Sequence, residues 1–218
     1  EVRQALAKQQ FSLSLQPQLI TKNKKLYGFE ALLRWHHPDR GFVPPDDFIP
    51  ILENSEHMIE LGYWIIRHCF EIMEQLHDYG TKDARIAINL TAGQFIDPNL
   101  PHYLLGLLKE FSLPASSFEL ELTEQTLVKD IDRTIEVMEM LKHIGFSFAI
   151  DDFGTGYSSL AYLKQMPVDV IKIDKSFIFG MLDNKADYQI IMSTIAMVKR
   201  LELLAVAEGV ETSAQLRS

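Results

Sequence analysis

The sequence predicts an α/β fold of the TIM-like (β/α) barrel type, in which the first strand is antiparallel to its neighbour. From Arg85 onward, short β-rich runs alternate with longer helical patterns, which is typical of βα units and a parallel sheet. This unit repeats about every 25 to 35 residues, as a barrel requires. Two strand-like runs precede this region, and the polar residues 21–25 between them predict a hairpin turn.

The predicted strands are short runs whose apolar residues alternate with smaller or polar ones. They cover residues 11–16, 26–35, 85–90, 118–122, 146–151, 169–173 and 203–208. The helical patterns cover residues 56–79, 101–111, 130–143 and 186–200, and Gly145 and Pro167 mark helix ends. Residues 37–50 are rich in Pro and Gly and predict a loop.

Length and composition predict one soluble globular domain over residues 1–218. Hydrophobic residues make up 47% of the chain, and no apolar run approaches the roughly 18 residues of a membrane helix. Seven predicted strands are one fewer than a barrel of about 250 residues contains, and Ser218 falls inside an expected helix. We therefore expect a C-terminally truncated barrel that lacks its last strand.

The charge balance argues against a partner that is a polymeric nucleic acid. The chain has 21 Lys and Arg against 30 Asp and Glu, a net charge of −9, whereas phosphate neutralisation needs a basic surface. A small anionic ligand that is met by metals or by a few cations fits this balance. The single cysteine, Cys69, fits a reducing cytoplasm. Since the chain does not begin with Met, we expect a cytoplasmic domain whose parent protein could be membrane-anchored.

Several predicted strands place one polar residue at their carboxyl end, where barrel enzymes hold their catalytic groups. A single residue of this kind is well explained as a helix N-cap or a surface acid. Several in matching positions favour a shared site instead. The residues are Asn89, Glu121, Asp151, Lys172 and Glu208.

Carboxylates that converge without an equal number of basic residues repel one another, so this site needs cations. Oxygen ligands that include an Asn carbonyl select a hard ion such as Mg²⁺ or Mn²⁺. The seven histidines do not form a zinc motif, because no pair has the spacing of a metalloprotease helix.

The adjacent acids Asp151 and Asp152 begin a glycine-containing turn, Phe153-Gly154-Thr155-Gly156. This turn lacks the Lys of a P-loop and the third Gly of a dinucleotide fingerprint. The acid pair is the informative feature, because one side chain can bridge two metals while the other binds the second.

These residues belong to an ordered set of short motifs that extends over nearly the whole chain. The motifs are Gln16-Pro17, Glu30-Ala31-Leu32-Leu33-Arg34, Phe48-Ile49-Pro50, Asn89-Leu90-Thr91, Glu121-Leu122-Thr123-Glu124, residues 151–160, Val170-Ile171-Lys172-Ile173-Asp174 and Ala207-Glu208-Gly209-Val210-Glu211-Thr212. In this set the chain resembles the EAL domains, bacterial phosphodiesterases of cyclic di-GMP.

The resemblance implies a role for each matched residue. Glu30, Asn89, Glu121 and Asp151 would bind one metal, and Asp151 and Asp152 would bind a second, with Glu208 nearby. Lys172, Glu208 and Asp152 would serve catalysis, because Lys172 orients the attacking water and Glu208 ligates through water or acts as base. Gln16, Arg34 and Lys172 would contact the substrate, and Glu124 would anchor the loop after Asp152.

The implied activity is the hydrolysis of cyclic di-GMP to the linear dinucleotide pGpG with two Mg²⁺ or Mn²⁺ ions, with Ca²⁺ inhibitory. A homodimer is implied, and an upstream sensor or GGDEF domain is expected in the parent protein. Two alternatives stay open: a catalytically weak or inactive EAL domain that acts as a cyclic di-GMP receptor, and an EAL-like scaffold that acts only through protein contacts.

Overall fold

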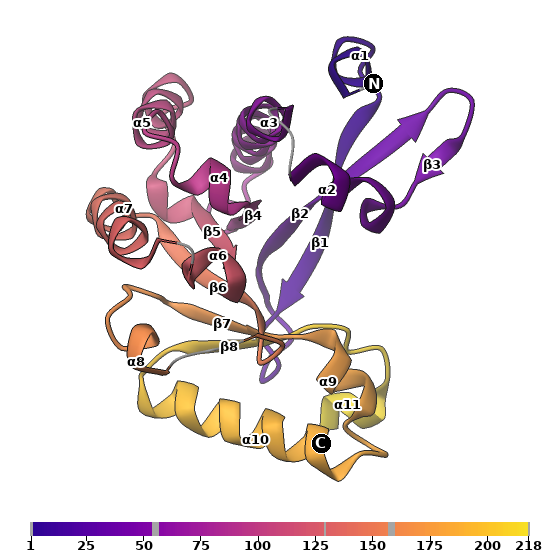
Figure 1. Ribbon diagram of the computed structural model, residues 1–218, viewed down its shortest axis with the longest axis vertical. Coiled ribbons are helices and arrows are strands. Elements are labelled where there is room, and N and C mark those ends of the chain that lie inside the picture. Colours follow the sequence, from indigo (N-terminus) through magenta and orange to yellow (C-terminus); the bar gives the residue numbers. More distant parts are fainter. Residues whose placement is uncertain (1, 54–56, 129, 157–159, 218) are drawn as a thin grey trace. The chain divides into compact units, whose positions relative to one another are not determined.

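The computed structural model describes residues 2–53, 57–128, 130–156 and 160–217 (Figure 1). The chain divides into two compact units, Glu1–Glu119 and Leu120–Ser218, and the boundary falls inside strand β5. The strands are β1 Phe11–Leu19, β2 Leu26–His37, β3 Gly41–Val43, β4 Ile86–Leu90, β5 Phe118–Thr123, β6 Ser147–Phe153, β7 Val170–Ile173 and β8 Leu204–Ala207. The helices are α1 Val2–Ala7, α2 Pro45–Glu53, α3 His57–Asp78, α4 Ala92–Phe95, α5 Leu100–Glu110, η1 Ala115–Ser117, α6 Glu124–Val128, α7 Ile131–Ile144, α8 Leu160–Leu163, α9 Lys175–Gly180, α10 Lys185–Arg200 and α11 Ser213–Arg217.

In the first unit, β1 and β2 form the predicted antiparallel hairpin, and β4 adds to β2 in the parallel direction. The register sets Gln16 opposite Glu30 across the hairpin and Glu30 opposite Ala87 on β4. Each of these strands matches a predicted one, although β1 and β2 run on beyond the predicted ends.

The predicted loop over residues 37–50 is wrong, because this segment contains β3 and most of α2. Gly41 has a φ of 72°, which turns the chain back so that residues 41–43 pair with the end of β2. Pro45 then begins α2, where its fixed φ suits the first helical position. Phe48 on this helix is buried, so core packing stabilises a helix that composition alone obscured.

The core of the first unit is built around aromatic contacts between the hairpin and the helices that cover it. The Phe11 ring lies 5.5 Å from Trp35 and 6.1 Å from Phe48, measured between ring centroids. The buried residues of this cluster are Ala5, Phe11, Leu33, Trp35, Val43, Phe48, Leu52, Met58 and Leu61.

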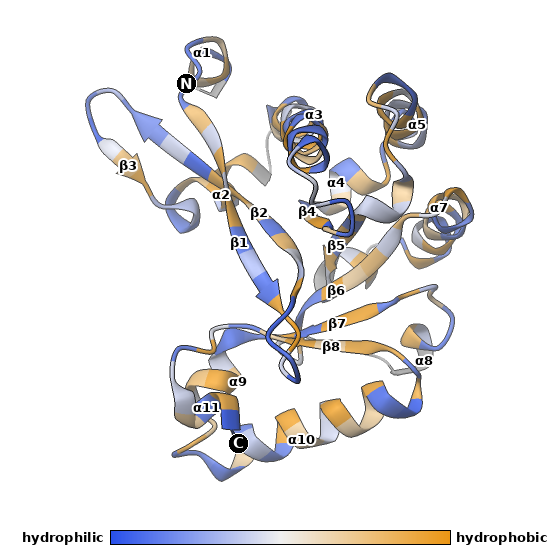
Figure 2. Cartoon of the chain, turned by 180° about the vertical axis from the view of Figure 1, so that it is seen from behind, coloured by the Kyte–Doolittle hydropathy of each residue, from blue (hydrophilic) through white to orange (hydrophobic). Residues whose placement is uncertain are grey.

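In the second unit the strands follow the order β5, β6, β7, β8, and β7 pairs in parallel with both β6 and β8. Helix α10 runs alongside β7 and β8 (Figure 1). Apolar residues dominate β6, β7 and β8 (Figure 2), and every residue of β7 is buried. This succession of parallel strands and helices after an antiparallel first strand confirms the predicted α/β fold class.

Strand β8 comes last in the strand order of the described residues, and its four residues are exposed or half-exposed. This exposure agrees with a TIM-like barrel that lacks its last strand. Within the described ranges, no helix is long and apolar enough to span a lipid bilayer.

Candidate functional site

In the first unit, Glu30 on β2 and Asn89 on β4 contact each other directly. Asn89 lies two residues beyond Ala87, the parallel partner of Glu30, so both side chains leave the sheet on the same face. The Asn89 Nδ2 atom donates a hydrogen bond of 2.9 Å to Glu30 Oε1. Two of the predicted metal ligands are therefore already held together.

The two predicted substrate contacts lie on the same hairpin. Gln16 is directly opposite Glu30, and directly opposite residues of an antiparallel pair share a face. Arg34 lies four residues after Glu30 on β2, so strand alternation gives it the same face. Its Nη1 donates to the Leu33 carbonyl at 3.0 Å.

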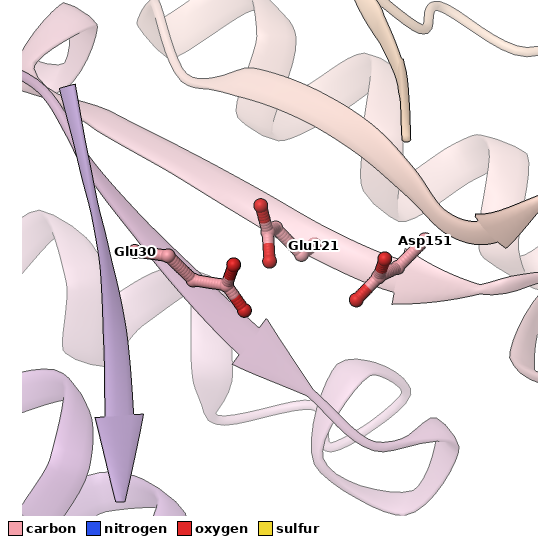
Figure 3. A group of neighbouring side chains, drawn as sticks. All are labelled: Glu30, Glu121 and Asp151. Carbon is pink, nitrogen blue, oxygen red and sulfur yellow. The ribbon is translucent and has the colours of Figure 1, made fainter. Parts of the chain in front are cut away.

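In the second unit, Lys172 on β7 is fully buried and contacts three carboxylates. Its Nζ atom lies 2.8 Å from Glu121 Oε2 on β5, 3.3 Å from Asp151 Oδ2 on β6 and 2.7 Å from Glu208 Oε1, just after β8. The carboxylates of Glu121 and Asp151 appear in Figure 3. The four successive strands β5 to β8 thus each place one charged side chain near their carboxyl end, and these side chains meet at the Lys172 ammonium group.

The charges of this group do not balance. The group contains three carboxylates and one ammonium, and Lys172 is 0% exposed and Glu121 only 1% exposed. Excess charge of one sign is costly inside a protein unless a cation neutralises it. The donor atoms are oxygens, which suits a hard divalent ion.

Asp152 joins a second carboxylate group with Asp151 and Glu208, in which one oxygen of each residue lies within 4.8 Å of the others. The pairing of β6 with β7 shifts register between Ile150 and Phe153, and Asp152 has a φ of 53°. Such a bulge turns a side chain away from the regular alternation. This turn explains how two adjacent residues can contribute to one group.

The environment of Asp152 disfavours its charged form. Burial, followed by the carboxylates of Asp151 and Asp174, raises the pKa of Asp152 to about 6. A divalent ion would reverse this effect by favouring the carboxylate. The residues present therefore fit a metal.

Glu124 begins α6 directly after β5, and both of its carboxylate oxygens accept backbone hydrogen bonds from the turn after Asp152. Gly154 N donates to Oε1 at 3.2 Å, and Gly156 N donates to Oε2 at 2.9 Å. Glu124 is 6% exposed, so these bonds are shielded from water. The structure thus places Glu124 where the predicted loop anchor would be, while residues 157–159 of the same motif lie outside the described residues.

Asp174 is a site residue that the sequence analysis did not single out. It is 8% exposed, accepts a 3.0 Å hydrogen bond from Ser176 N at the start of α9, and contributes to the raised pKa of Asp152. Its position two residues after Lys172, at the end of the same strand, is the signal that could have identified it.

The structure brings Gln16, Glu30 and Asn89 together in the first unit, and Glu121, Asp151, Asp152, Lys172 and Glu208 in the second. The predicted metal site of Glu30, Asn89, Glu121 and Asp151 draws on both units and stays a prediction. Within the described part of the chain, no histidine joins a group of potential metal ligands.

Comparison with known proteins gives a consistent family. The family model for the EAL domain matches residues 1–218. Two curated relatives come from Pseudomonas aeruginosa. The cyclic di-GMP phosphodiesterase NbdA is 41% identical over 99% of this chain and 28% of its own length. The bifunctional diguanylate cyclase/cyclic di-GMP phosphodiesterase MucR is 40% identical over 99% of this chain and 31% of its own length.

The fold has close solved counterparts. A structure of the PaMucR phosphodiesterase in complex with c-di-GMP superimposes with a TM-score of 0.95 at 39% identity, over 99% of this chain and 87% of the other. The predicted family resemblance and the TIM-like fold class are both confirmed. The chain spans about three tenths of the length of the curated relatives, 28% and 31%.

Proposed function

Because this chain belongs to the EAL domain family, we propose that it is a metal-dependent phosphodiesterase that hydrolyses cyclic di-GMP to linear pGpG. NbdA and MucR are both named as cyclic di-GMP phosphodiesterases, and the PaMucR structure contains c-di-GMP. The observation that carries the proposal is the buried Lys172, whose Nζ atom lies within 3.3 Å of the carboxylates of Glu121, Asp151 and Glu208.

We assign the metal ligands as the family resemblance implies. Glu30, Asn89, Glu121 and Asp151 would hold one Mg²⁺ or Mn²⁺ ion, and Asp151 and Asp152 would hold a second, with Glu208 nearby. When bound, such ions lower the pKa of a water molecule and stabilise the attacking and leaving oxygens of an in-line displacement.

The side chains of the second unit would direct the reaction. Lys172 would orient the attacking water and place a positive charge where negative charge develops on the phosphate. Glu208 contacts Lys172 at 2.7 Å and its side chain is 23% exposed, so water can reach it. Glu208 would help to hold the second ion, through a water molecule, or would accept the proton of the attacking water as general base.

The first unit would supply substrate contacts. Arg34 carries a planar fork of donors that matches a phosphate, and Gln16 offers an amide on the face of Glu30. Both residues would affect substrate affinity more than the chemical step.

The wider assembly is also a proposal, because the chain covers only part of its relatives. We expect it to act as a cytoplasmic homodimeric domain, joined to a sensor or to a GGDEF domain. MucR, which is named as bifunctional, shows that one relative combines a cyclase with the phosphodiesterase.

Product analysis tests the function. The chain is incubated with cyclic di-GMP and Mg²⁺, and the products are identified by chromatography and mass. Linear pGpG is the expected product, and Glu121→Gln should reduce its formation at least about 100-fold through loss of a ligand. Tight binding without any product would support the alternative of a cyclic di-GMP receptor, and no binding would support the scaffold.

A further inference from the structure

Helix α9 follows β7 directly and therefore starts beside the loops that follow β6 and β8, the two strands whose ends supply the second carboxylate group. β7 pairs with β6 on one side and with β8 on the other. Asp152 is the second-last residue of β6, the loop after β6 begins at Gly154, and the loop after β8 begins at Glu208. A helix in this position can contact both loops.

The first contact joins α9 to the loop after Asp152. Gly154 has a φ of 99°, and a Cβ atom added there would lie 2.9 Å from Cε2 and 3.3 Å from Cζ of Phe177. The backbone of Gly154 thus rests against the Phe177 ring. Its N–H donates to Glu124, so the loop is bonded by Glu124 and also packed against Phe177.

The second contact joins α9 to the loop after Glu208. Gly209 has a φ of 70°, and a Cβ atom added there would lie 3.0 Å from Cε1 of Phe179 and 2.8 Å from Cβ of Lys175. Phe177 and Phe179 are two residues apart on a helix, so their side chains point to nearly opposite sides. Phe177 therefore packs against the loop after β6, and Phe179 packs against the loop after β8.

The helix that carries these rings is itself held firmly. Asp174 accepts from Ser176 N at 3.0 Å at its start, and the Ile178 carbonyl accepts a 3.2 Å bond from Gln215 Nε2 on α11. Its inner face packs into a cluster formed by Ile173, Ile178, Met181 and Ile191, with Phe177, Tyr188 and Ile195 around it. These contacts hold α9 in place beside both loops.

We infer that Phe177 and Phe179 are positioning residues that hold Asp152 and Glu208 in the geometry needed to bind the second metal ion. This inference rests on the proposed function. Neither ring would touch substrate or metal. Each would act through a glycine that follows the carboxylate, two residues after Asp152 and one residue after Glu208.

The test measures Mn²⁺ binding by calorimetry without substrate and hydrogen exchange of the loop amides in the full chain. Phe177→Ala should weaken the second Mn²⁺ site about tenfold and speed exchange over residues 152–156. Phe179→Ala should have the same effect on metal binding and speed exchange over residues 208–211. Phe177→Leu replaces Phe177→Ala if the alanine variant does not fold.

Two variants serve as matched controls. Ile195→Ala removes a side chain of α10 from the same cluster, and Leu182→Ala removes a side chain that is as exposed as Phe179. Both should leave the second Mn²⁺ site and the loop exchange unchanged. Gly154→Ala should disturb the same loop, because its new methyl group meets the Phe177 ring and because a φ of 99° strains any residue other than glycine.

Equal metal affinity and equal loop exchange in Phe177→Ala and Ile195→Ala would overturn the inference for Phe177, and the same holds for Phe179→Ala against Leu182→Ala. A wild-type chain that binds Mn²⁺ but releases no pGpG would refute the proposed function alone. A wild-type chain without any Mn²⁺ binding would overturn both, even if the exchange data still showed that the rings order the loops.

Discussion

Lys172 is fully buried and contributes a positive charge to the carboxylates of the candidate site. Its ammonium group is within 3.3 Å of three carboxylates, and in the absence of a metal it is the cation that these groups share. In the metal-free protein, the positive charge of this buried lysine offsets part of the carboxylate charge that a metal ion would otherwise neutralise. The residue therefore matters for the stability of the metal-free protein as well as for the proposed reaction.

Lys172→Met should lower the free energy of unfolding of the metal-free protein by roughly 3 to 5 kcal/mol, because it leaves buried carboxylates without their partner. Added Mn²⁺ should recover part of the loss. Urea unfolding with and without the ion measures both effects. Lys199→Met, at an exposed position on α10, is the control, and equal losses for the two variants would contradict the role of Lys172.

The raised pKa of Asp152 predicts that the stability of the metal-free protein depends on pH. Its pKa rises from 3.8 in the unfolded chain to about 6 in the folded one. Between these values the folded protein holds a proton that the unfolded chain has released, so stability falls as pH rises through this window. Asp152→Asn should therefore raise the melting temperature of the metal-free protein at about pH 8 and much less at about pH 4.5.

Thermal unfolding over this pH range measures the effect, with the exposed Asp83→Asn as the control. A gain for Asp152→Asn that is the same at both pH values would show that its charge is not the cause. The same proton explains why Mn²⁺ binding should weaken as pH falls through about 6, since the ion needs the carboxylate form.

Strand alternation predicted which side chains share a face, but it could not predict their contacts. The places of Asn89, Glu121, Asp151, Lys172 and Glu208 at strand ends predict all five as site residues. The bulge at Asp152 was not foreseeable, because alternation assumes a regular strand. The contacts of Lys172 depend on its side-chain conformation, which cannot be predicted from the alternation of residues along a strand.

At the scale of elements, the long apolar patterns were predicted well and the short elements were not. Helix α7 spans Ile131–Ile144 against the predicted 130–143, because Asp130 caps it and Gly145 ends it with a φ of 115°. Strand β3 has three residues, too few to show a periodicity. Strand β3 forms because it pairs with β2. This pairing cannot be predicted from the short sequence of β3 alone.

Two helical glycines allow a matched test of packing. A Cβ atom at Gly62 on α3 would lie 2.3 Å from Nε2 of Gln94, and Gln94 is buried and donates to the Met58 carbonyl at 2.7 Å. Gly106 on α5 has no heavy atom within 4 Å of the same position. The first glycine therefore lets two helices approach, and the second only adds flexibility.

Gly62→Ala should destabilise the chain by about 1 to 3 kcal/mol through overpacking. Gly106→Ala should stabilise it by about 0.5 to 1 kcal/mol, because alanine is the better helix former. Chemical denaturation compares the two variants. Similar changes of the same sign would show that helix propensity, and not the contact with Gln94, decides the outcome at Gly62.

For the whole molecule, the alternation of strands and helices after Arg85 was sufficient to predict the fold class, which the TM-score of 0.95 to PaMucR confirms. The division into two compact units was not predicted, because one regular repeat gives no reason to expect a boundary inside β5. The family was identified because its motifs occur in order along the chain, and each motif alone would have been weak.

The most direct test of the central claim is the hydrolysis rate of cyclic di-GMP after chelation, followed by stepwise return of a divalent ion. The proposed chemistry predicts no pGpG from the chelated chain, recovery with Mg²⁺ or Mn²⁺, and no recovery with Ca²⁺. Glu30→Ala should remain folded and should not recover at the same ion concentrations. Undiminished hydrolysis by the chelated chain, or full recovery by Glu30→Ala, would contradict the claim that these carboxylates bind catalytic metal ions.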